Sequence, residues 1–180
     1  MKILITGGAG YIGSHTALNL LEKGNDLEII DSLCNSYPKV LERVEHLKKR
    51  GTSYGEMIFH QGDIRDIDFV EKIFKKSFDK KKPIEAVIHF AGLKSVSESI
   101  QYPEKYWNFN VDGSKVLLKI MDKYECRNIV FSSSATVYKF SGLNQFLTET
   151  AKTNPINPYG ETKLEVEKIL KALFKKEKNS

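Results

Sequence analysis

Cysteine is scarce in this sequence, and long apolar runs are missing from it. Only two cysteines, Cys34 and Cys126, occur among 180 residues. They are too few and too far apart for a disulfide framework or a zinc site, so we expect reduced thiols and no bound metal. Because every apolar stretch is short, none can cross a bilayer as a helix, and the run before the first glycines is too short for a secretory signal. We therefore expect a cytoplasmic protein without a membrane partner.

A nucleic-acid-binding motif is also missing. The 28 Lys and Arg residues exceed the 23 Asp and Glu residues, which gives a net charge of +5. Much of this excess lies within residues 75–82 and 171–178, as lysine runs typical of a solvated helix face. Aromatic residues do not alternate with these lysines, so we expect no nucleic-acid partner. The mild positive charge can at most steer an anionic ligand.

The sequence contains short β-branched runs that alternate with longer segments of helical period. This pattern predicts an α/β fold with a Rossmann-like, doubly wound parallel sheet. The predicted strands cover residues 3–6, 27–31, 56–61, 86–90 and 128–132. The predicted helices cover residues 11–24, 66–78, 106–124 and 158–176. The length suits one domain over residues 1–180 and leaves no room for a second of normal size.

The last predicted helix has clear start signals. Asn157 can cap it and Pro158 suits its first turn. Its apolar positions form one stripe, made by Val166, Ile169, Leu170, Leu173 and Phe174. No further strand follows this helix in the sequence, although doubly wound sheets often continue at this point. We therefore expect a sheet that is incomplete at the C-terminus.

A glycine-rich loop follows the first predicted strand and opens the first predicted helix. Missing side chains let the backbone approach an anion, and the helix N-terminus offers N–H groups and a partial positive charge. The loop therefore predicts a cradle for the pyrophosphate of a dinucleotide. Two registers fit the glycine spacing, one through Gly8, Gly10 and Gly13 and the other through Gly7, Gly10 and Gly13.

Polar and small residues at the ends of the next strands fit the same ligand. Asp31 can accept hydrogen bonds from ribose hydroxyls and repel a 2'-phosphate, and the nearest arginine in the sequence is Arg43, so NAD is favoured over NADP. Asp63 can accept from the adenine amino group, and the small Ala91 and Gly92 allow close passage of the cofactor. The alternative is that Asp31 only caps a loop and that the other residues form ordinary turns.

Tyr159 and Lys163 are four residues apart, on one face of the last predicted helix. A nearby cation favours the ionised phenol, so Tyr159 can accept a hydroxyl proton as hydride leaves the carbon. Ser134, at the end of a predicted strand, can bridge the same hydroxyl. The alternatives are a chance Tyr–Lys spacing and a polar strand end whose serines bond to the backbone.

These motifs, in this order, resemble the extended short-chain dehydrogenase/reductase family from Lys2 to the end of the chain. Residues 7–15, 31–36, 62–65, 89–94 and 132–138 are similar to the UDP-glucose 4-epimerase branch of that family. The resemblance implies bound NAD and a reversible oxidation at C4 of UDP-glucose or UDP-galactose, through a 4-keto sugar. It implies that Tyr159 takes the hydroxyl proton, that Ser134 positions the hydroxyl, and that Lys163 holds the ribose and favours the ionised phenol.

The resemblance also implies a set of binding residues and allows a homodimer. The cofactor would contact Gly7, Gly10, Tyr11, Ile12, Gly13, Asp31, Asn35, Ser36, Asp63, Ile64, Phe90, Ala91, Gly92, Lys94, Asn110, Tyr159 and Lys163. The UDP-hexose substrate would contact Lys94, Ser134 and Tyr159.

Two features refine this expectation. Relatives that dehydrate nucleotide sugars carry an Asp-Glu pair after the threonine of the serine segment, whereas Val137 and Tyr138 follow Thr136 here, which favours epimerisation. The family also continues beyond this C-terminus with a small domain that binds the sugar nucleotide. Since substrate positioning can contribute ~7 to 11 kcal/mol, we expect weak or no turnover from this chain alone. The alternatives are a non-catalytic NAD-binding module and another sugar-nucleotide reductase or dehydrogenase of the family.

Overall fold

A computed structural model describes residues 1–47, 54–139 and 146–178. The chain divides into two compact units. The first comprises Met1–Ala91 and Lys115–Ser132, and the second comprises Gly92–Ser114 and Ser133–Ser180. Among the residues described, no helix is long and apolar enough to span a membrane.

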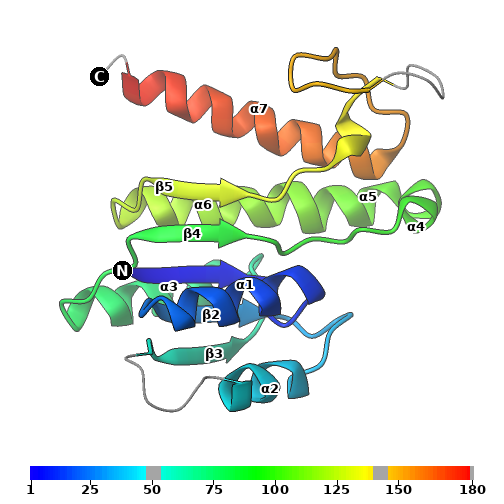
Figure 1. The fold of residues 1–180 in the computed structure, drawn as a ribbon. Helices are drawn as coiled ribbons and strands as arrows, with labels where there is room; N and C mark the ends of the chain where they lie inside the picture. The colour runs from blue at the N-terminus through cyan, green and yellow to red at the C-terminus, as the bar shows by residue number, and fades with distance from the viewer. Residues whose placement is uncertain (48–53, 140–145, 179–180) are drawn as a thin grey trace. The chain divides into compact units, whose positions relative to one another are not determined.

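Five parallel strands form the sheet of the first unit (Figure 1). They are β1 (Lys2–Thr6), β2 (Asp26–Asp31), β3 (Met57–Gln61), β4 (Ala86–His89) and β5 (Asn128–Phe131), in the order β3-β2-β1-β4-β5. Every predicted strand is confirmed to within one residue at either end, and so is the Rossmann-like fold. The strand order reverses between β1 and β4, and ligands of such sheets bind beyond the carboxyl ends of the strands at this reversal.

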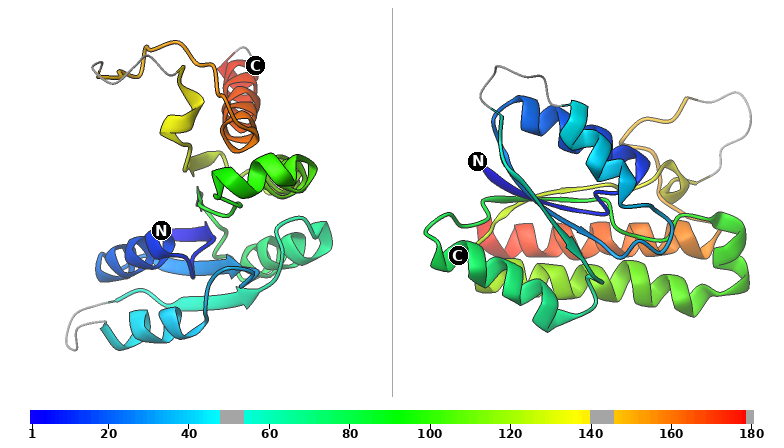
Figure 2. Two further views of the ribbon diagram at one scale, coloured as in Figure 1. Left: turned by 90° about the vertical axis from the view of Figure 1, so that its right-hand side faces the viewer. Right: turned by 90° about the horizontal axis from the view of Figure 1, so that it is seen from below.

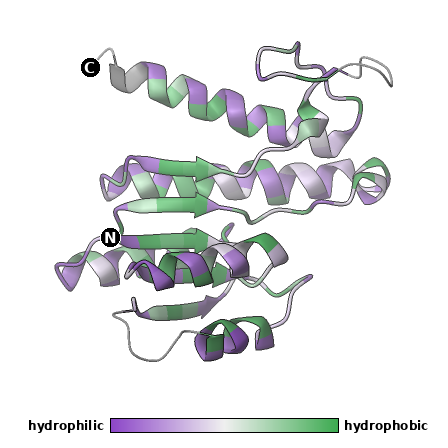
Figure 3. Cartoon of the chain, in the orientation of Figure 1, coloured by the Kyte–Doolittle hydropathy of each residue, from purple (hydrophilic) through white to green (hydrophobic). Residues whose placement is uncertain are grey.

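Helices cover both faces of the sheet in this unit (Figure 2, left). On one face, α1 (Tyr11–Glu22) and α2 (Lys39–Leu47) contribute Ala17, Leu21, Leu41 and Val44 to a cluster with β1 and β2. On the other, α3 (Ile67–Asp79) and the part of α6 (Gly113–Lys123) from Lys115 onward pack on the sheet. The strands are rich in apolar residues (Figure 3), and β1 and β2 are buried along nearly their whole length, as expected of central parallel strands, whereas Val130 of β5 is 63% exposed.

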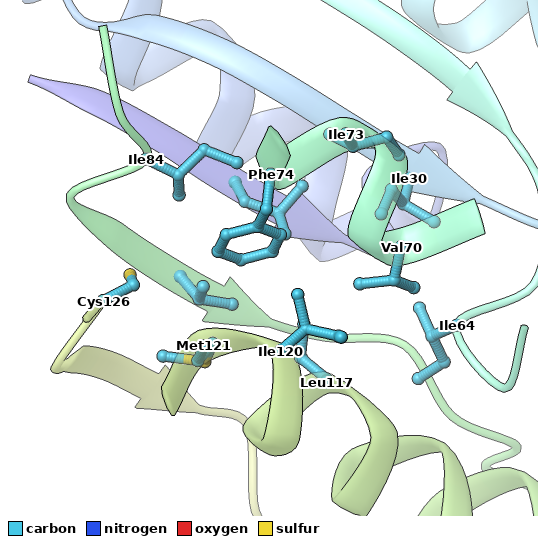
Figure 4. Close-up of a cluster of buried hydrophobic side chains, with 12 residues drawn as sticks. Ile30, Ile64, Val70, Ile73, Phe74, Ile84, Leu117, Ile120, Met121 and Cys126 are labelled. Carbon is cyan, nitrogen blue, oxygen red and sulfur yellow. The ribbon is translucent and has the colours of Figure 1, made fainter. Parts of the chain in front are cut away.

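The larger apolar cluster lies between the sheet, α3 and α6 (Figure 4). Phe74 of α3 is 2% exposed and belongs to the same cluster as Leu117, Ile120 and Met121 of α6. Cys126 is buried in this cluster, whereas Cys34 is exposed. Burial in apolar surroundings raises the pKa of the Cys126 thiol. The cluster fixes α3 and α6 against the strands.

A polar cluster interrupts the apolar packing next to α3. Glu28 of β2 is 4% exposed, and its carboxylate accepts a hydrogen bond of 2.8 Å from Lys2 Nζ. His60 Nε2 lies 2.6 Å from the second carboxylate oxygen, Glu28 Oε2. Ser77 Oγ of α3 donates to the first, Glu28 Oε1, at 3.3 Å. Burial alone raises the pKa of Glu28, but the hydrogen bonds from His60 and Lys2 outweigh it and leave the pKa below its ordinary value. Side chains from three elements, β1, β3 and α3, thus converge on one buried carboxylate of β2.

The second unit consists of helical elements. They are α4 (Val96–Gln101), α5 (Pro103–Tyr106), the π-helical segment η1 (Trp107–Asp112), the 3-10 turn η2 (Ala135–Val137) and α7 (Pro158–Lys178). The prediction of one helix over residues 106–124 is wrong, because η1 separates α5 from α6. A π-helical turn holds one extra residue, which the spacing of apolar residues does not reveal. The short helices α2 and α4 were not predicted, because charged and polar residues dominate them.

The other predicted helices are confirmed. Gly24 has a φ of 77° directly after α1, and Asp66 caps α3 by accepting from the Phe69 N–H. Asn157 Oδ1 caps α7 by accepting a hydrogen bond of 2.8 Å from the Gly160 N–H. The apolar stripe of α7 is fully buried at Val166 and becomes exposed toward Phe174, which is 58% exposed.

Candidate functional site

The loop after β1 is packed through its glycines. Gly7 has a φ of 71°, and a Cβ built on Gly13 would lie 2.4 Å from the Gly7 oxygen. A Cβ on Gly10 would lie 3.2 Å from the same oxygen. Gly8 instead packs on the sheet, where its Cβ would lie 2.5 Å from Ile29 Cγ2. These contacts favour the register through Gly7, Gly10 and Gly13.

The start of α1 offers backbone donors. Its N-cap is Gly10, which makes no side-chain capping hydrogen bond, and its first turn contains no acidic residue. The first N–H groups of the helix therefore meet no capping side chain, and the helix dipole adds a partial positive charge. The side chains of Tyr11 and Ile12, both predicted cofactor contacts, are 80% and 58% exposed. The geometry suits a phosphate group.

Asp31 ends β2, and its carboxylate accepts hydrogen bonds from both the glycine loop and the loop that follows β2. One carboxylate oxygen accepts from the Ala9 N–H at 2.9 Å, and the other accepts from Leu33 N–H at 2.9 Å and Ser36 Oγ at 2.8 Å. The loop-capping alternative therefore describes these contacts correctly. An ionised carboxylate has about four acceptor sites, so capacity for a ribose hydroxyl remains. Asn35, predicted for the same loop, has an exposed side chain.

Asp63 forms an ion pair that the sequence did not predict. Arg65 Nε and Nη2 both donate to its carboxylate, the latter at 2.6 Å. The hydrogen bonds from Arg65 hold the pKa of Asp63 below its ordinary value, against the effect of burial. The predicted Ile64 is 6% exposed and belongs to the apolar core, which leaves its backbone for contact with a ligand.

The end of β4 lies against the glycine loop. Phe90 N–H donates to the Thr6 oxygen at 3.0 Å, and a Cβ on Gly7 would lie 2.7 Å from the Ala91 nitrogen. The structure therefore brings together the predicted residues Gly7, Phe90 and Ala91 at the reversal of the strand order. A side chain larger than that of glycine does not fit at residue 7.

In the second unit, Asn110 acts as a clamp within η1. Its Oδ1 accepts from the Leu93 N–H at 2.8 Å, and its Nδ2 donates to the Leu93 oxygen at 3.0 Å and to Thr162 Oγ1 at 3.1 Å. Both amide protons are used by the protein. A Cβ on Gly92 would lie 3.0 Å from Asn110 Oδ1 and 3.6 Å from Lys163 Nζ, so these three predicted residues lie together.

Tyr159 and Lys163 are neighbours on α7, as their spacing predicts. Lys163 is 6% exposed, and its Nζ lies 5.9 Å from the centroid of the Tyr159 ring. Burial lowers the pKa of Lys163 to about 8. The ring centroid of Tyr106 lies 6.5 Å from that of Tyr159, with the rings nearly perpendicular at 85°. The phenol of Tyr159 therefore has a cationic neighbour and an aromatic neighbour.

Ser134 lies in a turn that contacts the start of α7. Its Oγ accepts hydrogen bonds from the Thr136 N–H at 3.2 Å and Thr136 Oγ1 at 2.9 Å. A Cβ on Gly160 would lie 2.7 Å from the Thr136 oxygen. Ser133 Oγ donates at 2.5 Å to Glu167 of the same helix. The Ser134 turn and the Tyr159 end of α7 are thus joined, while the predicted Lys94 has an exposed side chain.

Several residues of this region were not found from the sequence. Thr136 and Thr162 act by hydrogen bonds to predicted residues, and Gly160 acts by its lack of a side chain. The one available signal was a glycine within the first turn of a predicted helix, where alanine is preferred. No cluster of three or more His, Cys, Asp or Glu residues that could hold a metal ion occurs in the described part of the chain.

Comparison with known proteins confirms the resemblance to UDP-glucose 4-epimerases. Residues 4–179 match the family model described as GDP-mannose 4,6 dehydratase. A UDP-glucose 4-epimerase of Pasteurella multocida is 48% identical over 176 residues, which is 97% of this chain and 49% of that protein. The chain therefore spans about half the length of the curated relatives it matches.

Solved structures give the same result. One is the UDP-glucose-4-epimerase of Stenotrophomonas maltophila with bound NAD and formylated UDP-arabinopyranose, which matches with a TM-score of 0.85 at 43% identity. The match covers 96% of this chain and 48% of that enzyme's chain. Another is the UDP-glucose 4-epimerase of Bifidobacterium longum in complex with NAD+ and UDP, which matches with a TM-score of 0.86 at 41% identity. That match covers 96% of this chain and 49% of that enzyme's chain.

Proposed function

The chain belongs to the family described as GDP-mannose 4,6 dehydratase, and on this premise we propose that it binds NAD and carries the catalytic residues of a UDP-glucose 4-epimerase. One observation carries the catalytic part of the proposal. Lys163, 6% exposed, has its Nζ 5.9 Å from the ring centroid of Tyr159, on a helix whose first turn contacts the Ser134 turn through Gly160. The names of similar proteins, such as the UDP-glucose 4-epimerase of Pasteurella multocida, support a UDP-hexose as the proposed substrate, and a role in galactose metabolism stays a prediction.

The residues of the first unit fit a dinucleotide. The close contacts of Gly7 and Gly13 leave no room for side chains, and the uncapped start of α1 supplies donors for the pyrophosphate. Asp31 keeps acceptor capacity for ribose hydroxyls and opposes a 2'-phosphate by its charge. Arg65 would do little to offset the repulsion between Asp31 and such a phosphate, because its guanidinium is already hydrogen-bonded to Asp63. We therefore propose that the chain prefers NAD over NADP.

In the proposed reaction Tyr159 takes the proton from the 4-hydroxyl of the sugar and later returns it. NAD, held by the glycine loop and Asp31, would supply reversible hydride transfer at C4. Lys163 lies beside the phenol, with its Nζ 5.9 Å from the centroid of the Tyr159 ring. Ser134 directs a hydrogen bond toward the reacting oxygen, because Thr136 already donates to the Ser134 oxygen twice. Lys94 is proposed as a further contact of the cofactor and the sugar nucleotide.

Epimerisation is proposed rather than dehydration, although the family model is named after a dehydratase. Elimination of water needs an acid and a base besides the hydride-transfer residues, and the segment from Ser132 to Tyr138 contains no carboxylate. Since the chain spans about half the length of its relatives, we expect NAD binding to be retained and turnover to be weak. A homodimeric state and a cytoplasmic location stay predictions, and light scattering coupled to size exclusion measures the first.

Titration calorimetry with NAD and NADP tests the cofactor proposal. We expect binding of NAD, weaker binding of NADP, and loss of NAD affinity in Gly13→Ala, with the exposed Asn19→Ala of α1 as the matched control. Equal affinity for both cofactors would contradict the proposed role of Asp31.

Incubation with NAD and UDP-galactose, analysed for UDP-glucose, tests the reaction, with Tyr159→Phe as the inactive control. Accumulation of NADH instead of UDP-glucose would indicate a dehydrogenase, and NAD binding without any product would indicate a binding module.

A further inference from the structure

Tyr106 of α5 is a tyrosine without exposed surface in the second unit. Its hydroxyl donates to Glu98 Oε2 at 2.8 Å and accepts from the Ser95 N–H at 3.0 Å. Glu98 also accepts from Lys105 Nζ at 2.7 Å. The hydroxyl of Tyr106 is thus used both as a donor and as an acceptor by α4 and the residue that caps it. Removing that hydroxyl leaves two polar partners without their hydrogen bond.

The charges around this hydroxyl favour a fixed arrangement. The hydrogen bond from Lys105, followed by that from Tyr106, lowers the pKa of Glu98, so this carboxylate is ionised at neutral pH and can only accept. Burial, together with the carboxylate of Glu98, raises the pKa of Tyr106 to about 12. Tyr106 therefore stays protonated and keeps donating throughout the neutral range. Hydrogen bonds to a charged acceptor are stronger than neutral ones.

The ring of Tyr106 meets the ring of Tyr159. The centroids are 6.5 Å apart and the planes are inclined by 85°, an edge-to-face geometry that is favourable beyond simple burial. Lys163 Nζ, 5.9 Å from the Tyr159 ring centroid, supplies the second neighbour of this ring. A rotation about χ1 that carries the Tyr159 ring away from this position would lose these contacts.

We propose that Tyr106 is a positioning residue that connects the Lys94–Ser95 loop to Tyr159. Its hydroxyl anchors it to Ser95, next to Lys94, and its ring sets the orientation of the Tyr159 ring. The catalytic meaning of this link rests on the proposed function, because Tyr159 is the proposed base and Lys94 the proposed contact of the sugar nucleotide. The link itself needs neither cofactor nor substrate, so it can be tested separately.

Nuclear magnetic resonance of the whole chain, with carbon-13 in its tyrosine rings, tests the link. The chain has eight tyrosines, and the signal of Tyr159 is the one lost in Tyr159→Phe. We expect Tyr106→Leu to move the Tyr159 signal by more than its linewidth, and Tyr106→Phe to move it less while shifting the Ser95 amide. The matched control is Tyr124→Leu, since Tyr124 also bonds a glutamate through its hydroxyl and contacts two phenylalanine rings.

The outcomes decide the proposal whether or not the chain turns over substrate. A folded Tyr106→Leu whose Tyr159 signal is unchanged would overturn it, as would an equal shift in the Tyr124→Leu control. If Tyr106→Leu does not fold, Tyr106→Phe decides, because it keeps the ring volume and loses only the anchor. In that variant an unchanged Tyr159 signal overturns the link, whereas a shift of the Tyr159 and Ser95 signals supports it. Absence of NAD binding would contradict the proposed function and leave this link standing.

Discussion

Gly160 lies so close to Thr136 that a Cβ built on the glycine would be 2.7 Å from the threonine oxygen. The same Cβ would lie 2.9 Å from Pro155 Cβ, so it would meet atoms on two sides. Glycine costs about 0.5 to 1 kcal/mol relative to alanine inside a helix. The close approach of the Ser134 turn to α7 is therefore retained against the helical preference for alanine.

Gly160→Ala is expected to destabilise the chain by about 1 to 3 kcal/mol, because overpacking outweighs the gain in helix propensity. Urea unfolding measures the change. The reverse exchange at an exposed site of the same helix, Ala172→Gly, calibrates propensity and should cost about 1 kcal/mol. A Gly160→Ala variant that is more stable than the parent would contradict this, because it would show that the Ser134 turn can shift away from the added methyl group without loss of stability.

Lys163→Met is expected to stabilise the chain at pH 7. Because the pKa of Lys163 is lowered to about 8 by burial, the charged amine is disfavoured in the folded state. Below pH 8 this cost is fully present, and it disappears as the pH rises toward the ordinary lysine value, so parent stability rises over that window. At 1.36 kcal/mol per pKa unit, the gain in the variant is at most about 3 kcal/mol. Urea unfolding at several pH values measures the free energy of unfolding. At pH 7 it should be higher than in the parent for Lys163→Met and unchanged for the control, the exposed Lys168→Met.

Glu28→Ala is expected to cost at most about 3 to 5 kcal/mol, because it leaves the partly buried Lys2 and His60 without their partner carboxylate. Since the pKa of Glu28 is lowered on folding, its stabilisation is present above the pKa of a free glutamate, ~4.3, and is lost as the pH falls through the lower folded value. Thermal unfolding at neutral and acid pH measures both effects in Glu28→Ala and Glu28→Gln. Asp79→Asn, in an exposed ion pair with Lys75, serves as control and should change little. A similar loss in this control would refute the special role of the buried cluster.

Asn110→Ala separates two roles of this residue, which was predicted as a cofactor contact. As a clamp, its loss leaves Leu93 and Thr162 without three hydrogen bonds and should cost at least about 2 kcal/mol. Hydrogen exchange of the Leu93 amide should become faster, while the exposed Asn19→Ala leaves it unchanged. Unchanged stability and exchange with weaker NAD binding would instead indicate a direct contact with the cofactor.

Much of the fold could be predicted because its signals are local. Parallel strands buried on both faces read as short β-branched runs, and Gly24 and Asn157 mark helix ends through their own backbone or side chain. Tyr159 and Lys163 are four residues apart on one helix, so their proximity follows from helix geometry alone. The glycine loop is likewise a continuous stretch, although the choice between its two registers needed the packing of Gly8 on Ile29.

Some of the features that were missed depend on residues distant in sequence. Glu28 bonds to residues 26, 32 and 49 positions away, and no local pattern connects them. The ion pair of Asp63 with Arg65 was missed because the aspartate was assigned to a ligand. The extra residue in η1 is hidden because apolar residues still recur at nearly helical spacing on both sides of it. Tyr106 read only as the first residue of a predicted helix.

The π-helical stretch Trp107–Asp112 makes this part of the chain sensitive to its number of residues. Such a turn can relax to an ordinary helix when one residue is removed. Each residue of an α-helix advances the chain by about 100°, so the loss would swing Tyr106 to another side of the helical run. Deletion of a single codon here would therefore matter more than most substitutions, since the number of residues in η1, rather than their identity, sets the direction in which Tyr106 points.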